Sequence, residues 1–125
     1  MKTHIFTDST TERNELIFAY LKEISKFKLV TYSEEKEICK NLIDGKKKPR
    51  QRLVEGNLRF VISISRQYQN SGLGLMDLIN EGNIGLIKAS QMFDPVKGVR
   101  FKIFAVGWIR QAIMEALKEK SAKIK

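Results

Sequence analysis

Residues that carry enzyme chemistry are scarce in this sequence. Its 125 residues include one histidine and one cysteine. Cys39 has no partner for an internal disulfide, and His4 has no second ligand nearby, whereas metal sites need several ligands at fixed spacing. The sequence also lacks a nucleophile with a base beside it, a Walker loop and a GxGxxG motif. We therefore predict a binding protein that is not an enzyme and that holds no metal ion or other cofactor.

Long apolar runs are also missing. No segment approaches the roughly 18 apolar residues that suggest a membrane span, and the N-terminus lacks the apolar stretch of a secretion signal. Apolar residues nevertheless make up 42% of the chain and charged residues 30%, which is typical of globular proteins. The sequence thus predicts one domain with its own core, in the cytoplasm and not in a membrane.

Acidic residues are few, and they are unevenly placed. The chain has 14 acidic and 23 basic residues, a net charge of +9. Residues 95–125 hold eight basic and two acidic side chains, whereas residues 73–94 hold one basic and three acidic ones. The basic segment indicates a polyanionic partner such as nucleic acid, and its acidic neighbour requires a different partner. Lys46-Lys47-Lys48 is either a nucleic-acid patch or a solvated loop, since short lysine runs are common on surfaces.

Apolar periodicity predicts an all-α fold, a compact bundle of about five helices. The predicted helices span residues 12–26, 31–43, 49–68, 75–93 and the segment that follows a turn at 94–98. Strand signals, which would be an alternation of apolar and polar residues bounded by turn pairs, are absent. Thr31 and Glu34 form a capping box at the start of the second helix. Residues 1–11 carry no periodic signal and are predicted to be a flexible arm.

The fourth predicted helix contains two glycines, Gly82 and Gly85. Each costs about 0.5–1 kcal/mol relative to alanine in a helix interior, and close approach of another backbone is the usual compensation. The exposed side of this helix is polar and mildly acidic. The residues alone leave two interpretations open, an amphipathic helix packed tightly on its neighbour and an interface for another protein.

The last predicted helix has two different faces. One stripe at helical spacing is predicted to point inward and consists of Phe101, Ala105, Trp108, Ile109, Ala112 and Ala116. A second stripe, about 100° round the helix, consists of Phe104, Gly107, Gln111 and Met114. A core would not select glutamine, and a merely solvated face would not select phenylalanine and methionine. Because Arg100, Lys102 and Arg110 flank it, the second stripe suits a protein that stacks on bases and contacts phosphates.

Three segments closely resemble region 2 of bacterial sigma factors of the primary type, in the sigma-70 family. They are NLRFVISISRQYQNSGL (57–73), DLINEGNIGLIKA (77–89) and RFKIFAVGWIRQAI (100–113). A fourth segment, YLKEISKFKLVTYSEEKEICKNLIDG (20–45), resembles region 1.2 of the same family. The resemblance implies a region 1.2-like helical pair at residues 12–48 and a region 2-like domain at residues 49–125, which together form one structural unit.

The resemblance also implies a transcription initiation factor, or a fragment of one, that binds core RNA polymerase in the bacterial cytoplasm. The acidic fourth helix resembles the segment that docks on the clamp helices of the largest polymerase subunit, which favours the interface interpretation. The corresponding residues are Met76, Asp77, Asn80, Glu81, Asn83 and Ile87.

The resemblance further implies that the chain recognises and melts the promoter −10 element by capturing flipped bases of the non-template strand. Phe104 takes the position of the family's stacking tyrosine, against which an adenine packs. The implied DNA-binding set is Asn57, Arg59, Phe60, Phe93, Arg100, Lys102, Phe104, Gly107, Trp108, Arg110, Gln111 and Met114. Within it, the first three match the site of a flipped thymine, and the last two match the contacts to the upstream base pair. For Trp108, a buried core position is the competing interpretation.

The sequence departs from the family pattern at several of these positions. Gly107 stands where the family carries the first of two adjacent tryptophans, a wedge at the upstream fork of the melted DNA. Lys102 and Ile103 replace small hydroxylated residues, and Met114 replaces a threonine. These departures predict a weaker melter, or one tuned to a different −10 sequence.

Two other functions remain open at this point. One is a sigma-like interaction module or decoy that binds polymerase or an inhibitor without melting DNA. The other is a generic basic helical binder of nucleic acid, with no discrimination between bases. The chain ends inside the helix that closes region 2, as expected of a fragment of a longer sigma factor or of a truncated standalone form. Whether an anti-sigma factor is a further partner is not decided by the sequence.

Overall fold

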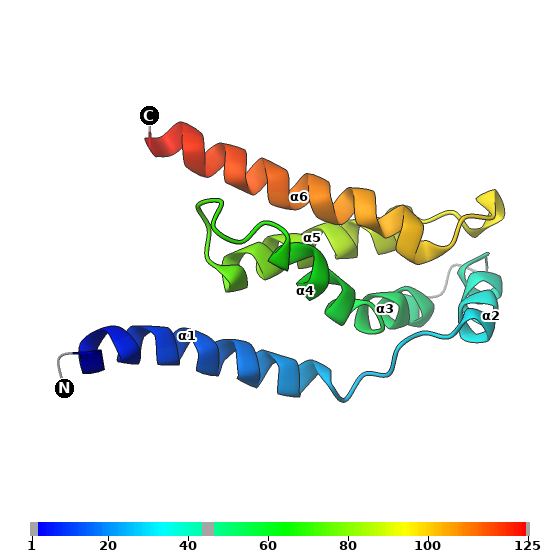
Figure 1. Cartoon of the computed structure of the whole chain (residues 1–125). Coiled ribbons are helices and arrows are strands. Elements are labelled where there is room, and N and C mark those ends of the chain that lie inside the picture. The colour runs from blue at the N-terminus through cyan, green and yellow to red at the C-terminus, as the bar shows by residue number, and fades with distance from the viewer. Residues whose placement is uncertain (1–2, 44–46, 125) are drawn as a thin grey trace.

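Six α-helices make up most of the chain in a computed structural model. The structure describes the backbone of residues 3–43 and 47–124 and the side chains of residues 12–42 and 48–122. The elements are α1 (Thr3–Ile24), α2 (Tyr32–Ile43), α3 (Lys47–Glu55), α4 (Leu58–Arg66), α5 (Leu75–Met92), a short 3-10 helix η1 (Pro95–Lys97) and α6 (Phe101–Ile124). The described residues contain no strand, so the predicted all-α class is confirmed. Figure 1 shows α5 and α6 as neighbours that run in opposite directions, with α1 along the far side of α4.

The pair formed by α5 and α6 is the most extensive helix contact in the structure. A turn joins the two helices, in which the Asp94 carboxylate accepts a hydrogen bond from the Val96 amide at 3.0 Å and Gly98 takes a left-handed φ of 74°. The two helices approach closely at Gly85, because a Cβ there would lie 2.9 Å from the Ile109 Cα and still closer to the Trp108 carbonyl. Gly82 instead faces the Val61 side chain, 2.7 Å from a hypothetical Cβ. The predicted close approach of another backbone is thus confirmed at Gly85, whereas at Gly82 side chains occupy the space.

The core-facing stripe of α6 differs from the prediction at three of its six residues, because Ala112 and Ala116, like Trp108, are only partly buried. Phe101, Ala105 and Ile109 are fully buried, as predicted, and Ile113 continues the row at the same spacing of four residues. Trp108, predicted on this stripe, is only half buried. At Gly85 the two backbones come close at the Trp108 carbonyl, and the Trp108 side chain packs, partly buried, against the core cluster.

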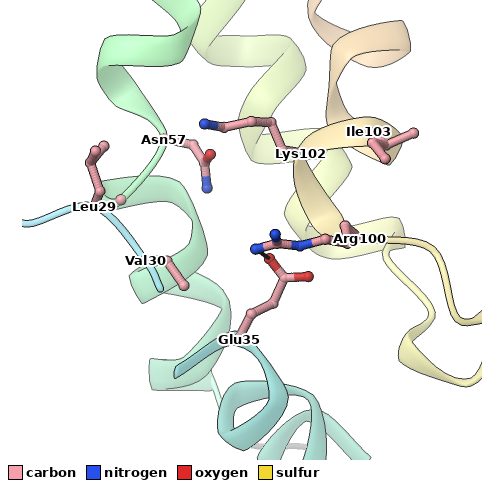
Figure 2. A pocket seen from close by; sticks show the side chains of 8 residues that line it. Leu29, Val30, Glu35, Asn57, Arg100, Lys102 and Ile103 are labelled. Carbon is pink, nitrogen blue, oxygen red and sulfur yellow. Dashed lines mark hydrogen bonds and ion pairs between the residues drawn. The ribbon is translucent and has the colours of Figure 1, made fainter. Parts of the chain in front are cut away.

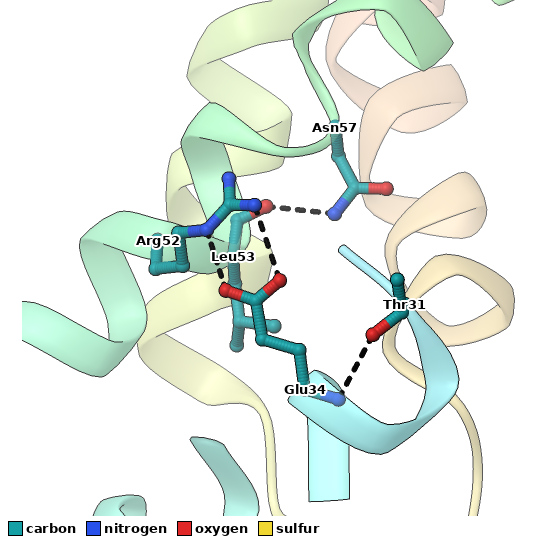
Figure 3. Close-up of polar contacts among 5 residues, drawn as sticks. All are labelled: Thr31, Glu34, Arg52, Leu53 and Asn57. Atoms are coloured by element: carbon teal, nitrogen blue, oxygen red, sulfur yellow. Dashed lines mark hydrogen bonds and ion pairs between the residues drawn. The ribbon is translucent and has the colours of Figure 1, made fainter. Parts of the chain in front are cut away.

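The long helix predicted at residues 49–68 is broken into α3 and α4 at Gly56 and Asn57. At the break, Gly56 lies so close to Val30, far away in sequence, that a Cβ there would collide with the Val30 side chain. Asn57 then turns its side chain back, and its amide nitrogen donates to the Leu53 carbonyl at 2.7 Å (Figure 3). That carbonyl lies in the last turn of α3, where it has no partner within the helix.

The start of α2 confirms half of the predicted capping box. The Glu34 amide donates to the Thr31 hydroxyl at 3.1 Å, so Thr31 is the N-cap (Figure 3). The Glu34 carboxylate does not turn back to Thr31. It accepts two hydrogen bonds from Arg52 of α3, at 2.7 and 3.2 Å, and so ties α2 to α3.

Helix α1 begins at Thr3, so most of the segment predicted as a flexible arm, residues 1–11, is helical where the structure describes it. Its last turns pack through Ile24 against Ile62 and Ile79, in a small cluster beside the main core. Further towards its N-terminus, Phe18 is 68% exposed. The His4 side chain lies outside the described side chains, and Lys46 lies outside the described backbone.

Replacing Gly85 with alanine will destabilise the protein. The added Cβ meets backbone atoms of Trp108 and Ile109, which cannot rotate away, so we expect a loss of about 1–3 kcal/mol in the free energy of unfolding. Urea denaturation followed by circular dichroism measures it. Gly74→Ala is the matched control, because its Cβ meets only the Asp77 carboxylate at 3.8 Å. Equal stability of the two variants would contradict the close approach of α5 and α6.

Candidate nucleic-acid and protein interfaces

The second stripe of α6 faces solvent. Gly107 and Gln111 are exposed, Met114 is 55% exposed, and Phe104 is half buried. These four positions follow one side of the helix, opposite the row of buried residues that begins at Phe101. The structure therefore keeps an aromatic ring, a bare backbone position, an amide and a thioether together on one accessible surface, which we call the outward stripe.

Phe104 is held in place by a second ring from the end of α5. Its centroid lies 5.5 Å from that of Phe93, and Phe93 in turn meets Phe101 edge-on at 5.2 Å. Phe93 itself is only 4% exposed. In this conformation the Phe93 ring is a core residue that supports Phe104, and its predicted contact with DNA stays a prediction.

A hollow of about 310 Å³ opens on the outward stripe. Phe104, Gly107, Trp108 and Gln111 line it. The Phe104 and Trp108 rings lie 6.2 Å apart with their planes inclined at 48°, so they form two walls of a V. Gln111 stands at the rim, where its amide nitrogen donates to the Glu115 carboxylate at 2.8 Å. This arrangement offers an aromatic surface beside an oriented amide.

Each of three cationic side chains lies over an aromatic ring from another part of the chain. One belongs to Arg100, the residue before α6, and the other two belong to Lys102 and Arg110 of α6. Arg100 lies 4.9 Å from the Tyr32 ring, Lys102 lies 4.9 Å from the Phe60 ring, and Arg110 lies 6.0 Å from the Tyr68 ring. Arg110 also donates to the Tyr68 hydroxyl at 3.2 Å. Such contacts contribute about 0.5–1 kcal/mol each at exposed sites. They leave the positive charges intact, so phosphates remain suitable ligands.

A cavity of about 190 Å³ lies between the break after α3 and the start of α6. Figure 2 shows the Lys102 ammonium and the Asn57 amide directed towards the same space, with Glu35 and Arg100 below them. Asn57 is only 6% exposed, and what remains of its surface faces this cavity. The remaining lining residues are Leu29, Val30, Gly56 and Ile103. The cavity thus combines apolar walls with a few polar groups, as small-ligand sites do.

Two residues of the predicted thymine site lie outside this cavity. Arg59 is exposed and donates to the Ser25 carbonyl at 3.3 Å, which ties α4 to the end of α1. Phe60 lies beneath Lys102 and orients it. Of the three predicted residues, only Asn57 lines the space in which a base would fit.

Glu35 is a residue of this site that the sequence analysis missed. Its carboxylate accepts a hydrogen bond from the Phe101 amide at 3.0 Å and lies 3.5 Å from the Arg100 guanidinium. It therefore caps the N-terminus of α6 from α2, where a negative charge also interacts favourably with the helix dipole. No local pattern reveals this contact, because the two partners are 66 positions apart in the chain.

The exposed side of α5 forms a second candidate surface, which we call the acidic face. It consists of Asp77, Asn80, Glu81, Ile84 and Ile87, with both isoleucines close to half exposed. Exposed isoleucines beside carboxylates are typical of a surface that another protein covers. Ile84 was not predicted. It could have been found from its helical spacing to Asp77, Glu81 and Ile87.

Two other predicted docking residues are engaged within the protein. Met76 packs against the Ile24, Ile62 and Ile79 cluster. The Asn83 amide nitrogen donates to the Tyr20 hydroxyl at 3.0 Å, which joins α5 to α1. Both therefore lie where α1 meets α5, at the border of the acidic face.

Among the described residues, no group of three or more acidic, histidine or cysteine side chains is placed to hold a metal ion. No helix in the part of the chain that the structure describes is long and apolar enough to cross a membrane. Burial raises the pKa of the Cys39 thiol, and the nearby Glu35 carboxylate raises it further. The thiol is thus protonated at neutral pH and a poor nucleophile.

The fold and these two surfaces define a helical domain of the sigma-70 region 2 class, since residues 53–123 match the family model of that region. The chain belongs to the sigma-70 family. Over 112 residues, which are 90% of the chain, it is 42% identical to the RNA polymerase sigma factor SigA of a Bacillus species. The chain spans 30% of the length of that relative. Sigma factors are not enzymes, which agrees with the prediction from the sequence.

Replacing Glu35 with alanine will weaken the junction between α2 and α6. The Phe101 amide loses its acceptor, so we expect about 1–2 kcal/mol less stability in urea denaturation. Glu37→Ala on the exposed side of the same helix is the matched control and should change stability by less than about 0.5 kcal/mol. The same loss in both variants would show that the cap contributes nothing.

Proposed function

We propose that this chain acts in bacterial transcription initiation by binding core RNA polymerase and capturing unpaired bases of the promoter −10 element. The outward stripe of α6 is the observation that carries the proposal. It presents Phe104 and Gln111 on an accessible surface with Arg100, Lys102 and Arg110 around it. Membership in the sigma-70 family supports the same conclusion.

Capture of bases accounts for melting without an energy source such as ATP. Pulling one base out of the stack costs a few kcal/mol. Stacking of that base on an aromatic side chain returns about 1–3 kcal/mol, and hydrogen bonds to its edge and to the phosphates supply the rest. Phe104, held by Phe93, provides the ring, and Gln111 provides donor and acceptor groups. The protein therefore stabilises the open strand and need not force the duplex apart.

A second base, downstream of the first, fits the cavity between Asn57 and Lys102. Its apolar walls exclude water from the base, while Lys102 and Arg100 are placed to contact the strand that leads into it. Lysine at position 102 gives this site a donor and a positive charge. The proposal therefore includes a preference at the downstream position that depends on Lys102.

The acidic face of α5 is the proposed docking surface for polymerase. It lies on a different helix from the outward stripe, so the chain can bind protein and DNA at the same time. Asp77 and Glu81 there face a partner of positive charge. Contacts of this kind set the rate of association and the choice of partner more than the final affinity.

Phe104→Ala will lower affinity for a single-stranded oligonucleotide that carries a matched −10 sequence. We expect a loss of about tenfold, within the range for one stacked base, measured by fluorescence anisotropy on the chain alone and on its complex with core polymerase. Gln111→Ala should reduce the preference for the matched over a scrambled sequence. Phe18→Ala removes a more exposed ring from α1, outside the outward stripe, and should have no effect.

Two results would contradict promoter recognition. Polymerase binding without any preference among DNA sequences would identify a decoy. Binding that weakens steeply with salt, with no difference between matched and scrambled sequences, would identify a generic binder of nucleic acid.

Asp77→Asn with Glu81→Gln will slow association with core polymerase. Removing two charges from the acidic face should lower the association rate several-fold at low salt, and less at high salt, because screening weakens long-range attraction. Surface plasmon resonance at two salt concentrations measures the effect. Glu37→Gln is the control for a carboxylate on another surface. An equal effect of both changes would place the interface elsewhere.

A further inference from the structure

Gly107 is the one helix-interior glycine of α6, and the packing of the protein does not explain it. A Cβ at Gly107 would have no atom within 4 Å, apart from its own chain neighbours and helix backbone. Gly82 and Gly85 differ, because neighbouring atoms crowd both of them. Glycine costs stability in a helix interior, and here no contact within the described residues compensates for it. A residue that destabilises its helix, without a compensating contact inside the protein, is typical of a functional position.

The missing side chain leaves a space of defined shape. The bare backbone of Gly107 is the floor of the hollow on the outward stripe, and Phe104 and Trp108 are its walls. Their rings are too close and too inclined to enclose a flat ligand as in a sandwich. A flat ligand can lie face-on against one ring with its edge towards the other, which is a favourable aromatic arrangement.

Gln111 adds hydrogen-bonding groups at the edge of the hollow. The contact with Glu115 uses one N–H of Gln111, so the second N–H and the carbonyl oxygen remain for a partner. Glutamine with a donor and an acceptor side by side is a common reader of base edges. Aromatic walls, an open floor and an oriented amide together describe a seat for a heterocyclic base.

We infer that an unpaired nucleobase enters the hollow and rests on the backbone of Gly107 between Phe104 and Trp108. The inference rests on the proposed function and deepens it, because it places the captured base over position 107. Here the DNA inserts a ring into the protein, so a side chain at position 107 would occupy the space that the base needs. A tryptophan at this position would therefore weaken binding, whereas a wedge mechanism predicts that it strengthens binding.

The test compares the whole chain with its Gly107→Leu, Gly107→Ala and Gly107→Trp variants, each bound to core polymerase. Anisotropy with a single-stranded oligonucleotide of matched −10 sequence gives the affinity. We expect Gly107→Leu to lower it about tenfold and Gly107→Trp to lower it at least as much. Thermal denaturation should show that Gly107→Ala melts a few degrees higher than the native chain, so that lost affinity does not reflect lost folding. Ala122→Leu adds a side chain to an exposed position of α6 outside the hollow and is the matched control.

Abasic oligonucleotides then locate the base. We expect one position at which removing the base abolishes the difference between the native chain and Gly107→Leu. A difference that persists with every abasic oligonucleotide, an unchanged affinity of Gly107→Leu, or a gain with Gly107→Trp would each overturn the inference. If Phe104→Ala and Gln111→Ala still lose matched binding in that case, the proposed function stands and only the seat at Gly107 fails.

Discussion

Close packing of α5 on α6 at Gly85 is the constraint on which the rest of the structure depends. Because position 85 has no side chain, the backbone of α6 lies directly against α5, and the row from Phe101 to Ile113 fills the core. Trp108, partly buried beside this contact, lines the hollow on the outward stripe. The lack of a side chain at position 85 thus brings α5 and α6 together, and the hollow on α6 lies beside that contact.

The packing also separates the two proposed partners. The acidic face belongs to α5 and the outward stripe belongs to α6, so each helix gives one side to the core and the other to a different surface. Contacts from the N-terminal half of the chain then fix the positions of individual residues. Glu35 of α2 holds the first turn of α6, and Arg52 of α3 holds Glu34. The N-terminal half of the chain therefore contributes to the proposed DNA-facing site and is more than an attachment to it.

Periodicity predicted the elements whose signals are local. The bounds of α5, the turn with Asp94 and Gly98, and the solvent-facing row on α6 all followed from spacing and turn chemistry. Contacts between distant residues could not be predicted in this way. Val30 packs against Gly56 at the break between α3 and α4, Glu35 caps Phe101, and Ile113 is fully buried where Trp108 was expected. The Gly-Asn pair at 56–57 is itself a frequent helix terminator and was the one local signal for that break.

The rings beneath Arg100, Lys102 and Arg110 have a consequence for how tightly the proposed DNA strand would be bound. A long, flexible side chain loses conformational freedom when it grips a ligand, at a cost of about 0.5–1.5 kcal/mol. Tyr32, Phe60 and Tyr68 restrict these three cations before any strand arrives. Part of this conformational entropy is therefore lost on folding. Less of it is lost when phosphate binds, so the net affinity for phosphate is higher.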